Sequence, residues 1–243
     1  MLKDQIILTC EHATNFIPKK YRGFFPLNKK VKGRWGNEKT KDVLNEHWGW
    51  DVGALNLAKY LSKKLNIPLH FFPVSRLLIE GNRYFLRSLF EEFTRNLPDE
   101  LKKDLIETFW FPHVDGIFRK IQKTIESEKQ ALHLGIHSFT PVHSGKHRDC
   151  DIGILFLSKR KNSRLFGHTL QAELKKQFPN FKIRRNYPYS GDLEGLVKFF
   201  SKNYNDDEYI AIELEVNNKH LRKNNSDLYK KIFQAIDRVV AEM

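Results

Sequence analysis

The sequence predicts an α/β fold, and both its patterning and its length support this. Short apolar runs alternate with segments whose apolar residues recur at helical spacing, as strands and helices do in α/β proteins. Of the 243 residues, 40% are hydrophobic and 29% are charged, which is ordinary for a globular protein. This length fits one large domain, or at most two small ones, with a core that needs no disulfides. We therefore expect a single domain over residues 1–243.

The first part of the chain opens on a strand, continues through a helix and returns to extended structure. Residues 5–10 form the first apolar run, and a long polar loop follows. Asp51 is expected to cap a helix. Residues 68–74 have the pattern of a strand, and residues 77–79 that of a second short extended piece. The apolar positions that define the helix are Val52, Leu55, Ala58, Leu61 and Leu65.

The middle of the chain is helical and then extended. Residues 97–130 are expected to form a helix in two parts, the second of which starts at Pro112. Residues 131–136 form an apolar strand, and residues 138–150 a polar loop. The second helical part has one apolar face, made of Val114, Ile117, Phe118, Ile121 and Ile125.

The last part alternates three strands with three helices. Residues 152–157 are almost continuously apolar, as expected of a strand buried on both faces. Residues 181–184 suit an edge strand, residues 193–203 a helix, and residues 209–214 the last strand. The two remaining helices have apolar stripes at Leu165, Leu170 and Leu174, and at Leu228, Ile232, Ile236 and Val240.

Three predicted strands lead into residues that bind metals or activate water. Glu11 and His12 follow the first strand, His137 follows the strand over 131–136, and Glu213 follows Ile212. In open α/β sheets this edge is where ligands bind. A single histidine at a strand end is commonly structural, but neutral imidazole is also a good zinc ligand. Two histidines and glutamates at one edge predict a metal hydrolase.

Glu213 is the candidate general base. An apolar strand rarely contains a carboxylate without a partner, and a metal-bound water needs a base beside it. The alternative is an edge strand with a solvated glutamate face, because Glu215 repeats at the two-residue period of a strand.

Three arginines are candidates for holding a substrate carboxylate. Arg76 and Arg83 flank the extended piece over 77–79, and Arg148 closes the loop before the next buried strand. A guanidinium group matches a carboxylate with two parallel hydrogen bonds. The alternative is that these arginines form surface salt bridges.

Two loops add further polar side chains. Tyr189 and Ser190 lie in a turn-rich segment, where their hydroxyl groups either line a substrate pocket or simply belong to a turn. His143 and His147 are ligands by residue type, but we expect them to be ordinary loop residues.

The formal net charge of +13 does not by itself indicate a nucleic-acid-binding protein. The 42 basic residues occur as short pairs and triplets, with no run of five or more. This pattern predicts solvated lysine-rich faces, and a cationic pocket in a basic protein also suits an anionic substrate.

Cysteine content and hydropathy bear on the compartment. Cys10 and Cys150 do not imply a disulfide framework, which favours a reducing cytoplasm. The N-terminal residues lack the apolar stretch of a signal peptide, and no uncharged window approaches the ~20 apolar residues of a membrane span. We expect a cytoplasmic protein with no membrane partner.

Taken together, these segments resemble the N-formylglutamate amidohydrolase family. The resemblance covers about residues 6 to 216, and the matching pieces occur in the family's order, which makes the set more specific than any one piece. The pieces are Cys-Glu-His-Ala-Thr-Asn (10–15), Asp51 to Ala54, Ser75 to Leu77 with Asn82-Arg83, His137 to Pro141, Gly145 with Arg148 and Ile152-Gly153, Asn186 to Gly191, and Ile212-Glu213.

The resemblance implies both a fold and a site. The family is similar in fold to zinc-dependent carboxypeptidases and aspartoacylase-like deacylases, which implies a three-layer α/β/α domain around a mixed sheet, of the phosphorylase/hydrolase-like type. By the same resemblance, His12 and His137 would bind one zinc ion. Asn82 and Arg83 would grip a substrate carboxylate, and Glu213 would be the general base.

Three departures from the carboxypeptidase pattern leave parts of the site open. Asn15 stands where carboxypeptidases have a glutamate ligand, so the third protein ligand is Glu11, Asp51 or Asn15, and we take Glu11. Glu80 stands where relatives usually have aspartate, and Glu215 replaces an expected arginine.

We therefore expect a zinc-dependent amidohydrolase that cleaves the amide of a small N-acylated, carboxylate-bearing molecule such as N-formyl-L-glutamate. Two alternatives stay open. One is an inactive basic protein that binds RNA or another polyanion, and the other is a hydrolase of peptides or other acyl amino acids.

Overall fold

A six-stranded mixed sheet forms the centre of the chain in the computed structural model, which describes residues 2–25, 39–91, 93–222 and 225–243. The strand order is β2-β1-β3-β8-β6-β7. All neighbouring strands pair in parallel except β6, which runs antiparallel to β8. The bounds are Ile6–Cys10 (β1), Leu69–Phe71 (β2), Ala131–Phe139 (β3), Ile152–Leu155 (β6), Ile183–Arg185 (β7) and Tyr209–Asn217 (β8).

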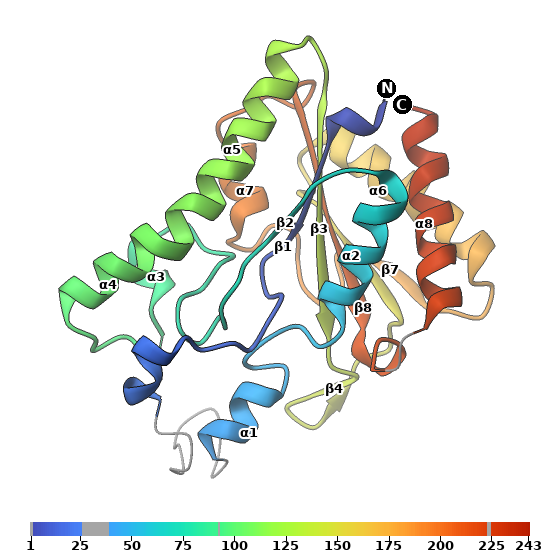
Figure 1. Ribbon diagram of the computed structural model, residues 1–243. Helices are drawn as coiled ribbons and strands as arrows, with labels where there is room; N and C mark the ends of the chain where they lie inside the picture. Colours follow the sequence, from blue (N-terminus) through green and yellow to red (C-terminus); the bar gives the residue numbers. More distant parts are fainter. Residues whose placement is uncertain (1, 26–38, 92, 223–224) are drawn as a thin grey trace.

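Helices cover both faces of this sheet, which confirms the predicted α/β architecture with a mixed sheet (Figure 1). One face is covered by α2 (Ala54–Leu65), α6 (Lys161–Gln177) and α8 (Ser226–Ala241), and the other by α5 (Phe111–Glu126) and α7 (Leu196–Ser201). Each Leu or Ile that these helices bury stabilises the fold by about 1.5–3 kcal/mol. The stripe that α8 buries consists of Leu228, Ile232, Ala235, Ile236, Val239 and Val240.

The remaining elements lie mainly around the edge of the sheet. Every helix in the described ranges is too short or too polar to cross a bilayer. The short helices are α1 (Thr40–Asn45), α3 (Leu86–Leu89), α4 (Asp99–Leu105), a π-helical turn (Ile106–Trp110), and 3-10 turns at Leu2–Gln5, Lys19–Phe24 and Asn218–His220. A two-stranded hairpin is formed by β4 (Val142–His143) and β5 (Lys146–His147).

Two strands are longer than the sequence predicts. The parallel pairing of β3 and β8 continues as far as Phe139 and Asn217, so it extends past the predicted ends at 136 and 214. His137 therefore lies within a strand, Glu213 lies within a strand as predicted, and His12 follows β1 as predicted. A side chain inside a paired strand is held more firmly than one in a loop.

Three local predictions are wrong. Residues 138–150 are not one continuous loop, because they contain the end of β3 and the β4–β5 hairpin, so His143 and His147 lie in short strands. Residues 77–79 form a turn rather than an extended piece, because the Leu78 and Ile79 N–H groups both donate to the Ser75 carbonyl. Asp51 does not cap the next helix directly, since α2 begins only after Gly53. Gly53 has a φ of 85°, and Leu221 packs so closely that a Cβ here would clash. Residues 26–38 of the predicted polar loop lie outside the described residues.

Candidate active site

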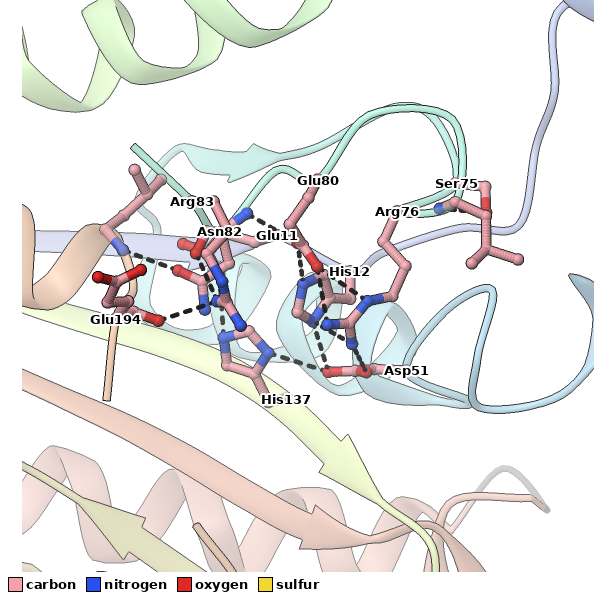
Figure 2. Close-up of polar contacts among 12 residues, drawn as sticks. Glu11, His12, Asp51, Ser75, Arg76, Glu80, Asn82, Arg83, His137 and Glu194 are labelled. Atoms are coloured by element: carbon pink, nitrogen blue, oxygen red, sulfur yellow. Dashed lines mark hydrogen bonds and ion pairs between the residues drawn. The ribbon is translucent and has the colours of Figure 1, made fainter. Parts of the chain in front are cut away.

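Three buried side chains converge at the carboxyl edge of the sheet. His12 follows β1, His137 lies in β3, and Asp51 lies on the segment that leads into α2. One ligand atom from each lies within 4.8 Å of the others (Figure 2). Imidazole nitrogens and a carboxylate oxygen are the donors that zinc prefers in proteins.

The two histidines turn the same ring nitrogen toward Asp51. Asp51 Oδ2 lies 2.9 Å from His137 Nδ1 and 3.5 Å from His12 Nδ1. The backbone holds Asp51 in this position, because its N–H donates to the His12 carbonyl at 2.9 Å. The Ser138 N–H also donates to Asp51 Oδ2, at 3.2 Å.

The other ring nitrogen of each histidine faces a buried carboxylate. His12 Nε2 lies 2.5 Å from Glu80 Oε1, and His137 Nε2 lies 3.1 Å from Glu11 Oε2. Histidines that bind metals nearly always donate their outer N–H to such a group, which fixes the tautomer and orients the ring. The His12, Asp51 and His137 group therefore fits a divalent metal in both its donors and its outer contacts.

Glu11 and Asn15, the other two candidates for the third ligand, lie outside this group. Glu11 meets the Nε2 edge of His137, opposite the edge that faces Asp51. Asn15 is half-buried, and its side chain donates to Asn45 Oδ1. Of the three alternatives, the structure brings only Asp51 together with both histidines.

The charges in this cluster stabilise one another. Burial alone would raise the pKa of Asp51, but the charge of His12 and the hydrogen bonds from His12 and His137 hold it well below its usual value. Burial also opposes ionisation of His137, yet the hydrogen bond to Asp51 and the negative charge of nearby Glu11 raise its pKa well above the usual range. Asp51 is therefore an anion at neutral pH, as a ligand must be.

Arg76 lies beside the same group. Its guanidinium group donates to Glu80 Oε2 at 2.8 Å, and its Nη1 lies 3.2 Å from His12 Nδ1. The pKa of Glu80 is held well below its usual value, because Arg76 and His12 outweigh the effect of burial. Arg76 thus places a fixed positive charge next to the two histidines.

Glu213 and the Asn82-Arg83 pair line a cavity of about 180 Å³ together with the two histidines and Asp51. Glu213 Oε1 lies 3.8 Å from His137 Nε2 and accepts a hydrogen bond from Asn82 Nδ2 at 3.2 Å. Arg83 Nη1 donates to the backbone carbonyls of Asn82 and Glu194, both at 2.9 Å. These contacts hold a carboxylate and a guanidinium group at the wall of one cavity.

Tyr189 and Ser190 line this cavity, but Arg148 does not. The Arg148 guanidinium group lies 4.8 Å from the centroid of the Tyr189 ring, and its Nη1 lies 3.4 Å from Thr140 Oγ1. Arg148 therefore packs on the ring of Tyr189. The direct contact between Arg148 and the site that the sequence predicted is not seen.

Two residues of this region were not among the predicted site residues. Glu215 lines the cavity, and its Oε2 is buried without a hydrogen-bond partner in the described chain. Burial raises its pKa to about 8. His133 lies deeper, where its ring nitrogens contact Thr9 Oγ1 at 2.9 Å and the Tyr209 hydroxyl at 2.6 Å. The sequence did hold a signal for both residues, because residues an even number apart in a strand lie on the same face. Glu215 shares a face with Glu213, and His133 shares a face with His137.

Comparisons with known proteins show the family and agree with the fold. A family model described as N-formylglutamate amidohydrolase matches residues 4–221. The structure of a gene product from Agrobacterium tumefaciens is similar at a TM-score of 0.78 and 23% identity, covering 98% of this chain and 91% of that one. The structure of N-formylglutamate amidohydrolase from Ralstonia eutropha JMP134 is similar at a TM-score of 0.67 and 13% identity, covering 98% and 93%. No curated protein gives a significant match.

Proposed function

Because the chain belongs to the N-formylglutamate amidohydrolase family, we propose that it is a zinc-dependent enzyme that hydrolyses the amide of a small anionic N-acyl amino acid. The family gives the reaction class, which is amide-bond hydrolysis. We propose in addition that the metal is zinc, and we propose which residues bind it and catalyse the reaction and which class of substrate is cleaved. The observation that carries it is the pair of histidines whose Nδ1 atoms face Asp51 while both Nε2 atoms face carboxylates.

His12, Asp51 and His137 would hold the metal. When bound, zinc lowers the pKa of a water molecule toward ~7 and polarises an acyl carbonyl. Glu11 and Glu80 face the Nε2 atoms of the two histidines. Their carboxylates would fix the orientation of the rings and make the Nδ1 atoms stronger electron-pair donors to the metal. This assignment replaces Glu11 by Asp51 as the third ligand, and it gives Glu11 a positioning role.

Glu213 is the general base of the proposed reaction. It takes a proton from the attacking water and returns it to the nitrogen of the leaving amine. The hydrogen bond from Asn82 keeps Glu213 Oε1 aimed at the cavity. Arg76 stabilises negative charge that develops on the acyl oxygen, because its guanidinium group lies beside His12 and Asp51.

Arg83 binds the carboxylate of the substrate's amino-acid part. Tyr189 and Ser190 line the same cavity and offer hydroxyl groups to that carboxylate. Arg148 contributes indirectly by holding the Tyr189 ring. A formal net charge of +13 favours the approach of an anionic substrate.

Metal analysis of the purified protein tests this proposal. We expect one equivalent of zinc per chain, which is lost in His137→Ala and in Asp51→Ala. Asn15→Ala is the matched control and should keep the full equivalent, because its side chain contacts Asn45 rather than the site. A full equivalent of zinc in Asp51→Ala would overturn the ligand assignment. Absence of zinc, together with no hydrolysis of any N-acyl amino acid in the presence of added zinc, would overturn the function.

A further inference from the structure

A second cavity of about 150 Å³ adjoins the first one. Asp51, Arg76, Ser138 and Tyr189 line both cavities, so the two meet at Asp51, one of the three candidate metal ligands. Trp48, which follows α1, and His143 of the β4–β5 hairpin line this second cavity. The function proposed above assigns no part of the substrate to this second cavity.

The proposed general base and the proposed carboxylate-binding residues lie at only one of the two cavities. Glu213, Asn82 and Arg83 line only the first cavity. An amide whose carbonyl carbon lies at the candidate metal ligands, and whose carboxylate meets Arg83, therefore places its amine part in the first cavity. Its acyl substituent then points toward the second. In a formyl group that substituent is a single hydrogen atom, which would leave the second cavity unfilled.

Flat rings form one wall of the second cavity. The His47 and Trp48 rings lie 4.3 Å apart between centroids with an interplanar angle of 35°. The His143 ring lies 5.9 Å from Trp48 and 6.2 Å from His47. Phe139, at the end of β3, is another aromatic residue that lines this space. Rings in such arrangements attract a further ring through offset stacking or edge-to-face contacts.

The two histidines of this wall are neutral at physiological pH. Burial, together with the nearby positive charge of Arg148, lowers the pKa of His47 to about 4. Burial and Arg148 also lower the pKa of His143. The Nε2 atom of His47 is buried and has no hydrogen-bond partner in the described chain. This aromatic wall is thus uncharged, with one polar position for a ring substituent, whereas the charged residues Asp51, Arg76, Glu80 and Glu91 line other parts of the cavity.

From this geometry we infer that the substrate carries a planar aromatic N-acyl group, which occupies the cavity lined by Trp48, His47 and His143. The inference rests on the proposed function and narrows its substrate to N-aroyl amino acids. A cavity of about 150 Å³ is large enough for one benzene ring. In the reaction, water adds to the aroyl carbon, the C–N bond breaks, and one water proton passes through Glu213 to the amine. The products are an aromatic carboxylate and an amino acid.

Kinetics of the zinc-loaded enzyme with acyl groups on one amino acid test this inference. N-benzoyl-L-glutamate should be hydrolysed with a kcat/KM at least tenfold above those of N-formyl-L-glutamate and N-acetyl-L-glutamate. Trp48→Ala should lower the benzoyl-to-formyl ratio of kcat/KM at least tenfold. His143→Ala, a smaller change on the hairpin, should lower the same ratio if Trp48→Ala does not fold. The control Phe118→Ala removes an exposed ring on α5 that lines neither cavity, so it should keep the ratio.

Binding without turnover gives a second readout. Zinc-loaded Glu213→Gln should bind N-benzoyl-L-glutamate at least tenfold more tightly than N-acetyl-L-glutamate in calorimetry, and Trp48→Ala in that background should remove the difference.

The outcomes separate the two proposals. Preference for the formyl compound, with a benzoyl-to-formyl ratio unchanged in Trp48→Ala and His143→Ala, overturns the inference and leaves the amidohydrolase proposal standing. Hydrolysis of none of the three compounds by the zinc-loaded enzyme overturns both.

Discussion

Glu80→Gln should weaken zinc binding without removing a ligand. Glu80 is buried, with its side chain 3% exposed, and it contacts both His12 Nε2 and the Arg76 guanidinium group. Glutamine keeps the size of the side chain but removes the negative charge that holds the proton on His12 Nε2 and makes Nδ1 a stronger donor to the metal. Loss of such an outer contact typically lowers metal affinity about 10–100-fold, which is about 1.4–2.7 kcal/mol.

We expect the loss of zinc affinity in Glu80→Gln to lie at the upper end of this range. Glu80 has a second role, because its Oε2 accepts two hydrogen bonds from Arg76, at 3.1 and 2.8 Å. In Glu80→Gln the Arg76 cation loses its nearest counter-charge while it stays 3.2 Å from His12 Nδ1. An uncompensated positive charge there repels a divalent cation. We therefore expect a loss close to a hundredfold.

Competition with a chromophoric chelator measures this effect. The zinc dissociation constant of Glu80→Gln should rise, while Glu80→Asp, which keeps the charge, should stay nearer to the starting protein. Unfolding of both metal-free variants, followed by circular dichroism, controls for a general loss of structure. A dissociation constant for Glu80→Gln within twofold of the starting protein would refute the idea that Glu80 supports a metal-binding histidine.

Three further predictions concern the base, the carboxylate site and the pH dependence. Glu213→Gln should keep one equivalent of zinc and lose about 10²–10⁴-fold in kcat, and a kcat near that of the starting protein would reject Glu213 as the base. Arg83→Lys should raise KM for a carboxylate-bearing substrate more than it lowers kcat, and equal KM values would remove Arg83 from substrate binding. In chelator-treated protein, the lowered pKa of Asp51 and of Glu11 predicts a melting temperature that falls as the pH drops below about 4. The raised pKa of His137 predicts stability that is full below about pH 6.5 and declines as the pH rises toward that raised value. His137→Ala should abolish the alkaline decline in a thermal scan, and an equally steep decline in this variant would contradict the prediction.

Much of the fold and two of the three residues of the metal group followed from strand patterns. His12 and His137 could be paired from the sequence because the carboxyl ends of parallel strands meet at one edge of a sheet. Asp51 was harder, because an aspartate before a helical stripe has the same appearance as a helix cap. Only the left-handed turn at Gly53 detaches Asp51 from α2 and leaves it beside the histidines.

Side-chain direction explains the other differences. Glu11 and His12 are adjacent in sequence, but only the folded chain shows that Glu11 meets the outer edge of the His137 ring. Arg148 follows a hairpin whose course the sequence pattern does not define, and it packs on Tyr189. Glu215 looked like part of a solvated face, yet it is buried beside His137, its register partner in β3. The single domain over residues 1–243 and the cytoplasmic location stay predictions.

A crystal structure of the zinc-loaded protein with anomalous data at the zinc edge tests the central claim most directly. The account predicts one anomalous peak about 2.0–2.2 Å from His12 Nδ1, Asp51 and His137 Nδ1, with Glu11 and Glu80 still on the outer ring nitrogens. A peak at His137 Nε2 with Glu11 as a ligand, or no peak among these residues, would contradict it.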